Sequence, residues 1–229
     1  MKKYADFILA LIALIISIVF AIIVITMNVK KNGGSLFPVE KSETHESNAT
    51  KSGKNAYTAD DETVGTIFIG DSRFVGMDKA VDIESKDRQF CVAKIGQGYY
   101  WFKNTALKKI EKIRKENTAL TKWRYVVCLG VNDLGNSENY LKLYDELTSS
   151  DDSIQLVLVS VNPVKNYPTI TNSQIKKFNV KLSDAGYDYI DTFSQLQKKG
   201  FQSTDGLHYD NETYEVIYNL IEKGLMDLE

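Results

Sequence analysis

The chain has 229 residues, of which 43% are hydrophobic and 25% are charged, so it fits one ordinary globular domain once a separate apolar segment is set aside. Its 28 basic and 30 acidic residues nearly balance, and no basic run interleaves with aromatic residues. We therefore expect no nucleic-acid partner. The only histidines are His45, in a polar stretch, and His208, which argues against a zinc centre built from histidine and cysteine. We expect no metal and no cofactor.

The two cysteines lie inside apolar stretches of the sequence. Cys91 stands between Phe90 and Val92, and Cys128 follows two valines. A cysteine in such surroundings usually behaves as a small buried hydrophobic side chain. We expect both to be free thiols, and a disulfide or a reactive thiol is the alternative.

The N-terminal part, residues 1–30, contains a long apolar run. Residues 7–27 carry no charge, and as a helix rising about 1.5 Å per residue they would span about 32 Å, enough for a bilayer. A cleaved signal peptide is the alternative, but the run is longer than a signal core and no Ala-x-Ala site follows it. We expect a single transmembrane anchor.

The charges that flank this apolar run do not decide its orientation. Lys2 and Lys3 precede it, and Lys30 and Lys31 follow it. A short basic tail before one apolar helix resembles an export signal that stays in the membrane. We expect the rest of the chain to lie outside the cytoplasm, attached to the cell membrane by a single span.

Residues 31–61 form a polar stretch between the predicted anchor and the apolar patterns of the domain. The stretch holds Gly33, Gly34 and Pro38 among many Ser, Thr, Asn, Lys and Glu residues. Such a composition buries too little apolar surface to offset the loss of chain entropy. We predict a flexible linker, with one globular domain over residues 62–229.

Within the predicted domain, apolar runs of strand length alternate with helical patterns. The expected strands are 64–69, 89–95, 125–129, 154–161 and 187–190. Helices are expected over 100–114 and 213–226, where apolar residues recur near every 3.6 positions. This alternation predicts an α/β domain of three layers, α/β/α, with a central parallel sheet of about five strands. In such a sheet the loops at the carboxyl ends of the strands build the functional site.

The first expected strand runs into the triplet Gly70-Asp71-Ser72, and a helix is expected to begin near Arg73. A serine at a strand-to-helix turn projects from the carboxyl edge of the sheet. Its backbone N–H lies near a helix N-terminus, where negative charge is stabilised. On its own the triplet is also typical of an ordinary turn.

Two further polar segments follow the same logic. Asn132 and Asp133 come after the third strand, either facing the region of Ser72 or completing a turn through their own backbone. Asp205 precedes His208 by three positions across a turn that contains glycine. This spacing can place a carboxylate on Nδ1 of the imidazole and leave Nε2 free to take a proton from a serine. A helix-capping aspartate beside an incidental histidine is the alternative.

Together these segments resemble the SGNH hydrolase family, also described as GDSL-like, whose four blocks supply a serine, a glycine, an asparagine and a histidine. The matching segments, in the family's order, are Gly70-Asp71-Ser72, residues 95–100 around Gly98, Gly130-Val131-Asn132-Asp133 and Asp205-Gly206-Leu207-His208. The resemblance runs from about Val64 to the end of the chain. It implies a flavodoxin-like fold.

The resemblance also implies roles for individual residues. Ser72 would be the nucleophile, His208 the general base and Asp205 the group that orients His208. The oxyanion hole would consist of the Ser72 and Gly98 backbone N–H groups and the Asn132 side chain. Gly96 competes with Gly98 for the glycine role, which we assign to Gly98 because it directly precedes the polar start of the helix.

Five residues next to these blocks are expected to contact substrate. Arg73 stands where the family has leucine and would alter the rim of the site, with Asp71 beside it. Tyr99, Tyr100 and Trp101 follow Gly98 and would stack on sugar rings. In the alternative interpretation, at least two of these three aromatic residues pack the helix onto the sheet.

The predicted function is a bacterial serine esterase that removes short acyl groups, above all acetyl, from a small ester or an acylated glycan of the cell envelope. An acyltransferase would use the same acyl-enzyme with a sugar hydroxyl in place of water. A lysophospholipase-like lipase is a further alternative. An inactive glycan-binding domain is the alternative from outside the enzymes.

Overall fold

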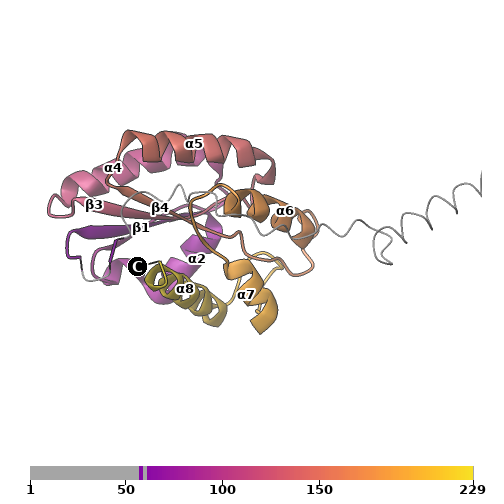
Figure 1. Ribbon diagram of the computed structural model, residues 1–229. Coiled ribbons are helices and arrows are strands. Elements are labelled where there is room, and N and C mark those ends of the chain that lie inside the picture. Colours follow the sequence, from indigo (N-terminus) through magenta and orange to yellow (C-terminus); the bar gives the residue numbers. More distant parts are fainter. Residues whose placement is uncertain (1–56, 59–60, 229) are drawn as a thin grey trace, which may run out of the picture. The chain divides into compact units, whose positions relative to one another are not determined.

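The computed structural model describes residues 57–58 and 61–228 (Figure 1). The predicted transmembrane segment, residues 7–27, and nearly all of the predicted linker lie outside these residues. Among the residues described, no helix is long and apolar enough to cross a membrane. The residues described belong to one compact unit.

A five-stranded parallel sheet forms the centre of this unit. The strands are β1 (Val64–Gly70), β2 (Gln89–Ala93), β3 (Lys122–Cys128), β4 (Ile154–Val159) and β5 (Asp188–Ile190). Their order is β2-β1-β3-β4-β5, and every neighbouring pair is parallel. The predicted parallel sheet of about five strands is confirmed, and its order is the flavodoxin-like one. In that order successive strands are added on one side of β1 and then, from β3 on, on its other side. Ligands of such folds bind at this switch between β1 and β3, beyond the carboxyl ends of the strands.

Helices cover both faces of the sheet, as Figure 1 shows with α4 and α5 on one side and α2 and α8 on the other. The α-helices are α2 (Ser72–Val81), α3 (Tyr99–Trp101), α4 (Leu107–Glu116), α5 (Ser137–Ser150), α6 (Asn172–Ser183), α7 (Thr192–Lys199) and α8 (Asn211–Met226). A π-helical turn, η2 (Phe102–Ala106), joins α3 to α4, and the 3-10 turns are η1 (Ile83–Ser85) and η3 (Leu134–Asn136). The predicted three-layer arrangement is confirmed for this unit.

The alternation of side chains along β1 explains the two cores. All seven residues of β1 are buried, as expected for a central parallel strand covered on both faces. Ile67 and Ile69 point into the core beneath α4, α5 and α6, whereas Phe68 points into the core beneath α2 and α8. The strand therefore stands between two apolar layers, and only its carboxyl end can present polar groups to a ligand.

The packed unit begins before the predicted boundary at residue 62. Tyr57 is only 3% exposed, and its carbonyl oxygen accepts a hydrogen bond from the Arg124 guanidinium. Asp61 forms an ion pair with Lys122, the first residue of β3, at 2.7 Å. The chain thus enters the unit beside the amino ends of the strands, at the edge opposite the loops that follow Gly70 and Cys128.

Candidate active site

Ser72 lies at the junction of β1 and α2. The strand ends at Gly70, and a side chain at this position would collide with Phe74, whose Cβ would lie 2.5 Å away. Asp71 is the N-cap of α2, and its carboxylate accepts a hydrogen bond from the Arg73 backbone N–H at 2.9 Å. This sharp turn presents Ser72, the first residue of the helix, at the carboxyl edge of the sheet with 7% of its surface exposed. The helix N-terminus there favours negative charge.

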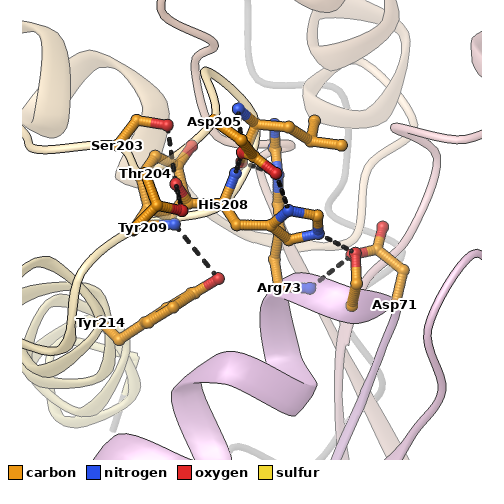
Figure 2. Close-up of polar contacts among 10 residues, drawn as sticks. Asp71, Arg73, Ser203, Thr204, Asp205, His208, Tyr209 and Tyr214 are labelled. Atoms are coloured by element: carbon orange, nitrogen blue, oxygen red, sulfur yellow. Dashed lines mark hydrogen bonds and ion pairs between the residues drawn. The ribbon is translucent and has the colours of Figure 1, made fainter.

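Ser72, His208 and Asp205 form one continuous line of hydrogen bonds. The Ser72 hydroxyl lies 2.8 Å from His208 Nε2, and His208 Nδ1 lies 2.7 Å from the Asp205 carboxylate. Figure 2 shows the imidazole of His208 between Asp205 and the start of α2. The structure therefore brings together the three residues that the sequence proposed as nucleophile, base and orienting acid.

The Asp205 carboxylate is held in its ionised form by its own turn. Its Oδ1 accepts the backbone N–H of His208 at 2.7 Å and that of Leu207 at 2.9 Å. The His208 N–H makes the largest contribution to lowering the pKa of Asp205 to about 2. An ionised acceptor at Nδ1 selects the tautomer that carries its proton on Nδ1, so Nε2 can accept the serine proton. The alternative interpretation of Asp205 was a helix cap. The cap of α8 is instead Asp210, which accepts the Thr213 N–H at 2.9 Å.

Arg73 holds the segment that carries His208. Its Nε donates to the Leu207 carbonyl at 3.2 Å, and its Nη1 donates to the Asn162 carbonyl, in the loop after β4, at 2.7 Å. The side chain is 2% exposed, so the expected contribution of Arg73 to the rim of the site is corrected: the guanidinium lies beneath the site. A buried cation needs such partners because leaving it unpaired would be costly. A second bond, from the Tyr209 hydroxyl to the Pro163 carbonyl, fixes the same segment.

The expected contact of Asp71 with substrate is also corrected. Its side chain is 3% exposed and is used to cap α2. Burial raises the pKa of Asp71, and the neighbouring Arg73 opposes this increase. The side chains of both charged residues that flank Ser72 are therefore buried and stabilise the surrounding turn, and neither is available to a substrate.

The proposed oxyanion groups come from the loops after β2 and β3. Asn132 is exposed beyond the end of β3, and its Nδ2 donates one hydrogen bond to the Gln97 carbonyl at 2.8 Å. Because an amide nitrogen carries two protons, one remains to donate elsewhere. Strands β1 and β3 pair with Gly70 opposite Cys128, which brings the loop of Asn132 to the edge where Ser72 lies.

The two candidate glycines have different surroundings. A Cβ on Gly98 would lie 2.5 Å from the carboxyl carbon of Asp133, so only glycine allows the two loops to approach. Gly96 has φ of +69°, and open space surrounds the position of a Cβ. Gly96 is therefore required by the turn itself, whereas Gly98 is required by close packing next to Asn132. This difference favours Gly98 as the glycine of the site.

The three aromatic residues after Gly98 divide in the way that the alternative interpretation proposed. Tyr99 is 9% exposed and Trp101 6% exposed, and both pack in the core, so their expected contact with substrate is corrected. Tyr100 is 68% exposed and lies edge-on against Tyr99, with ring centroids 5.2 Å apart. Ile95, in the same loop, is 65% exposed, and the sequence had not singled it out. Two apolar side chains thus face solvent beside the Gly98 loop.

Asp133 is a residue for which the sequence suggested no role beyond its block. Its carboxylate accepts hydrogen bonds from the backbone N–H of Tyr99 at 2.8 Å, the hydroxyl of Tyr140 at 2.9 Å and the amide of Asn136 at 3.1 Å. The available signal was its position directly after Asn132, where a carboxylate can reach a neighbouring loop. Among the residues that the structure describes, no group of three or more His, Cys, Asp or Glu residues is arranged to hold a metal ion.

Comparisons with known proteins concern the fold. No family model matches the sequence, and no curated protein matches it. Among solved structures, a protein from Slackia heliotrinireducens assigned to the SGNH hydrolases aligns over 71% of this chain and 98% of its own, with a TM-score of 0.54 and 12% identity. The C-terminal catalytic domain of peptidoglycan O-acetyltransferase A from Streptococcus pneumoniae aligns over 72% of this chain and 93% of its own, with a TM-score of 0.52 and 18% identity.

A third solved structure, the lipase Lip_vut3 from a goat rumen metagenome, aligns over 72% of this chain and all of its own, with a TM-score of 0.50 and 18% identity. At these identities the likeness concerns the fold. The unit described here has the fold of the SGNH hydrolases, as the sequence resemblance implied.

Proposed function

We propose that the protein is a serine acyl-ester hydrolase whose nucleophile is Ser72. The observation that carries this proposal is the line of hydrogen bonds from Ser72 through His208 to Asp205, at 2.8 and 2.7 Å. In the first half of the reaction, Ser72 Oγ attacks the ester carbonyl carbon while its proton passes to His208 Nε2. His208 then gives that proton to the departing alcohol, and an acyl group remains on Ser72.

In the second half, a water molecule gives a proton to His208 Nε2 as its oxygen attacks the acyl carbonyl. The bond from Ser72 Oγ to the acyl carbon then breaks, His208 returns the proton to Ser72 Oγ, and the acid is released. Both halves pass through a tetrahedral intermediate with negative charge on the former carbonyl oxygen. The N–H groups of Ser72 and Gly98 and the remaining Asn132 proton are the proposed donors to this oxygen. The three donors come from the segments after β1, β2 and β3, which meet at one edge of the sheet, and this placement supports the assignment.

For the substrate, we propose a short acyl group, above all acetyl, on a polar alcohol such as a glycan hydroxyl. Tyr100 and Ile95 are both exposed in the segment around Gly98, and the Tyr100 ring can stack on a sugar. A long acyl chain would need an apolar groove, because each buried CH₂ contributes about 0.8 kcal/mol. Residues 162–173, which follow β4, are mostly polar and offer little such surface.

For the location, we propose that residues 7–27 anchor the protein in the cell membrane and that the hydrolase domain lies outside the cytoplasm. The apolar run supports this placement. Tyr57 packs beside the amino ends of the strands, at the edge opposite Ser72. Protease added to intact cells after removal of the wall should digest the domain. Protection until lysis would reverse the topology.

An O-acyltransferase is the second candidate. The observation that favours it is the shared fold with the catalytic domain of peptidoglycan O-acetyltransferase A, of which 93% aligns. The same acyl-Ser72 intermediate would then be resolved by a sugar hydroxyl, whose proton passes to His208 as that of water does. The two activities differ only in which hydroxyl attacks the acyl carbon.

The decisive experiment uses the full chain in detergent with nitrophenyl esters from acetyl to octanoyl. We expect turnover that falls with chain length and disappears in Ser72→Ala. A value of kcat/KM that rises steadily toward octanoyl would point to a lipase. Adding a glycan fragment to the acetyl ester distinguishes hydrolysis, which yields acetate, from transfer, which yields acetylated sugar. No turnover and no transfer with any ester would leave glycan binding as the function.

A further inference from the structure

The loop that carries Gly98 is held on both sides of this residue by two consecutive residues of the loop after β3, Asn132 and Asp133. Before Gly98, the Gln97 carbonyl accepts a hydrogen bond from Asn132 at 2.8 Å. After Gly98, the Tyr99 N–H donates to the Asp133 carboxylate at 2.8 Å. The peptide that contains the Gly98 N–H is therefore held at its own carbonyl, that of Gln97, and the next peptide is held at the Tyr99 N–H. Both partners belong to the loop of the proposed oxyanion donor Asn132.

The Asp133 carboxylate is itself fixed by the helix that follows. Its Oδ1 accepts the Tyr140 hydroxyl at 2.9 Å, and Tyr140 is fully buried in α5. Its Oδ2 accepts two N–H groups, those of the Tyr99 backbone and the Asn136 amide. A carboxylate with three donors from three segments has little freedom to rotate.

The close approach of Gly98 and Asp133 shows that this contact determines the path of the loop. A Cβ at residue 98 would lie 2.5 Å from the Asp133 carboxyl carbon, so the glycine backbone rests directly against the carboxylate. The carboxylate cannot stabilise an oxyanion itself, because it carries the same charge and donates no proton. Any effect of Asp133 on the reaction must therefore act through the position of the loop.

We propose that Asp133 is the positioning residue of the oxyanion hole: its carboxylate fixes the loop at Tyr99 so that the Gly98 N–H points to the oxyanion. This inference rests on the function proposed above. Displacing a hydrogen-bond donor by about 1 Å can lower the rate about 10²-fold. Removing one oxyanion donor altogether lowers kcat by about 10² to 10³, so the two losses overlap. Asp133 thus acts on kcat although it does not touch the substrate.

The hydrogen bonds around Asp133 predict how its substitutions will differ. In Asp133→Asn the oxygen must replace Oδ2, which accepts two N–H groups, and the new NH₂ then faces the Tyr140 hydroxyl, which can accept. The asparagine should therefore hold the loop without a charge. Asp133→Ala removes the contact, and Asp133→Glu has no room for another methylene beside Gly98.

The test measures the three variants in the full chain on an aryl acetate and on its thionoacetate, in which sulfur replaces the carbonyl oxygen. An oxyanion hole favours oxygen, because sulfur is larger and a weaker acceptor. Asp133→Ala and Asp133→Glu should lose about 10²-fold in kcat on the acetate and much less on the thionoacetate. KM should change little, and Asp133→Asn should stay within about threefold of the wild type.

A matched control is Asp191→Ala, which removes another aspartate that accepts a backbone N–H, that of Ser194 at 2.9 Å, at the start of α7. It should leave both rates unchanged. Equal losses on both esters in Asp133→Ala, or an Asp133→Asn as slow as the alanine variant, would overturn the proposal. If Asp133→Ala does not fold, the comparison of Asp133→Asn with Asp133→Glu decides.

The rate at which a fluorophosphonate labels Ser72 provides a second readout that does not depend on ester turnover. In phosphonylation Ser72 Oγ bonds to phosphorus while its proton passes to His208 Nε2, and the phosphorus–fluorine bond breaks to release fluoride. Negative charge develops on the phosphoryl oxygen during attack. Labelling without turnover in the wild type would refute the esterase proposal and still test Asp133. Labelling should slow in Asp133→Ala and not in Asp133→Asn, and unchanged labelling in both would contradict the role of Asp133.

Discussion

The substitution Asp205→Asn would reverse the tautomer of the proposed base without changing the shape of the site. Oδ1 of Asp205 accepts two backbone N–H groups, at 2.7 and 2.9 Å, so the oxygen of an asparagine must occupy that position. Its NH₂ group then faces His208 Nδ1, which is forced to accept. The imidazole proton moves to Nε2, where it points at Ser72 and cannot take the serine proton.

The expected magnitude follows from the exposure of this carboxylate. In a buried Ser-His-Asp triad the same change lowers kcat by about 10⁴. The Asp205 side chain is 52% exposed, so water can compete for Nδ1 and weaken the tautomer preference. We expect a loss of about 10³ in kcat, which corresponds to about 4 kcal/mol of transition-state stabilisation. KM should change little.

The assay is steady-state hydrolysis of an aryl acetate by the full chain, with the midpoint of thermal unfolding measured in parallel. Asp191→Asn is the matched control, since Asp191 also accepts a backbone N–H in a cap but lies at α7. The control should keep wild-type kcat. An Asp205→Asn variant with more than about a tenth of wild-type kcat and an unchanged fold would refute the role of Asp205 in orienting His208.

Three further outcomes are expected. Ser72→Ala and His208→Ala should each lower kcat by several orders of magnitude, and the double variant should be scarcely slower, because nucleophile and base act as a unit; near-additive losses would argue against the pairing. Asn132→Ala should lower kcat by about 10² to 10³, and full activity would reduce Asn132 to a turn residue. The pKa of Asp205 is lowered in the folded state, so its contribution to stability is present above about pH 4 and lost as pH falls toward 2. Acid unfolding followed by circular dichroism should therefore show a shallower dependence on pH in Asp205→Asn, and an identical curve would contradict the shift.

The sheet and the order of the site segments were predictable because they follow from local patterns. Buried parallel strands appear as continuous apolar runs, and the polar residues that follow each run must gather at one edge. The limits of single elements were less certain. Strand β3 begins at Lys122 rather than 125, because Arg124 is buried through hydrogen bonds to Gln155 and to the Tyr57 carbonyl, which no local pattern reveals.

The direction of individual side chains could not be predicted in the same way. Arg73 follows the proposed nucleophile and was expected at the rim of the site, yet tertiary partners distant in sequence, Leu207 and Asn162, draw it inward. The same limit applies to the three aromatic residues after Gly98. Only the packing of Tyr99 and Trp101 against the sheet shows that Tyr100 alone faces solvent.

The anchoring of the His208 segment has a consequence for how the protein loses activity. Arg73 joins the first turn of α2 to the segment of His208 and to the loop after β4, and the Tyr209 hydroxyl adds a second tie to Pro163. A segment held only by exposed contacts would open locally at a low free-energy cost and take the base away while the core remained intact. Here the segment of the base is tied through buried hydrogen bonds to the first turn of α2 and to the loop after β4. Inactivation and global unfolding should therefore share one cooperative transition.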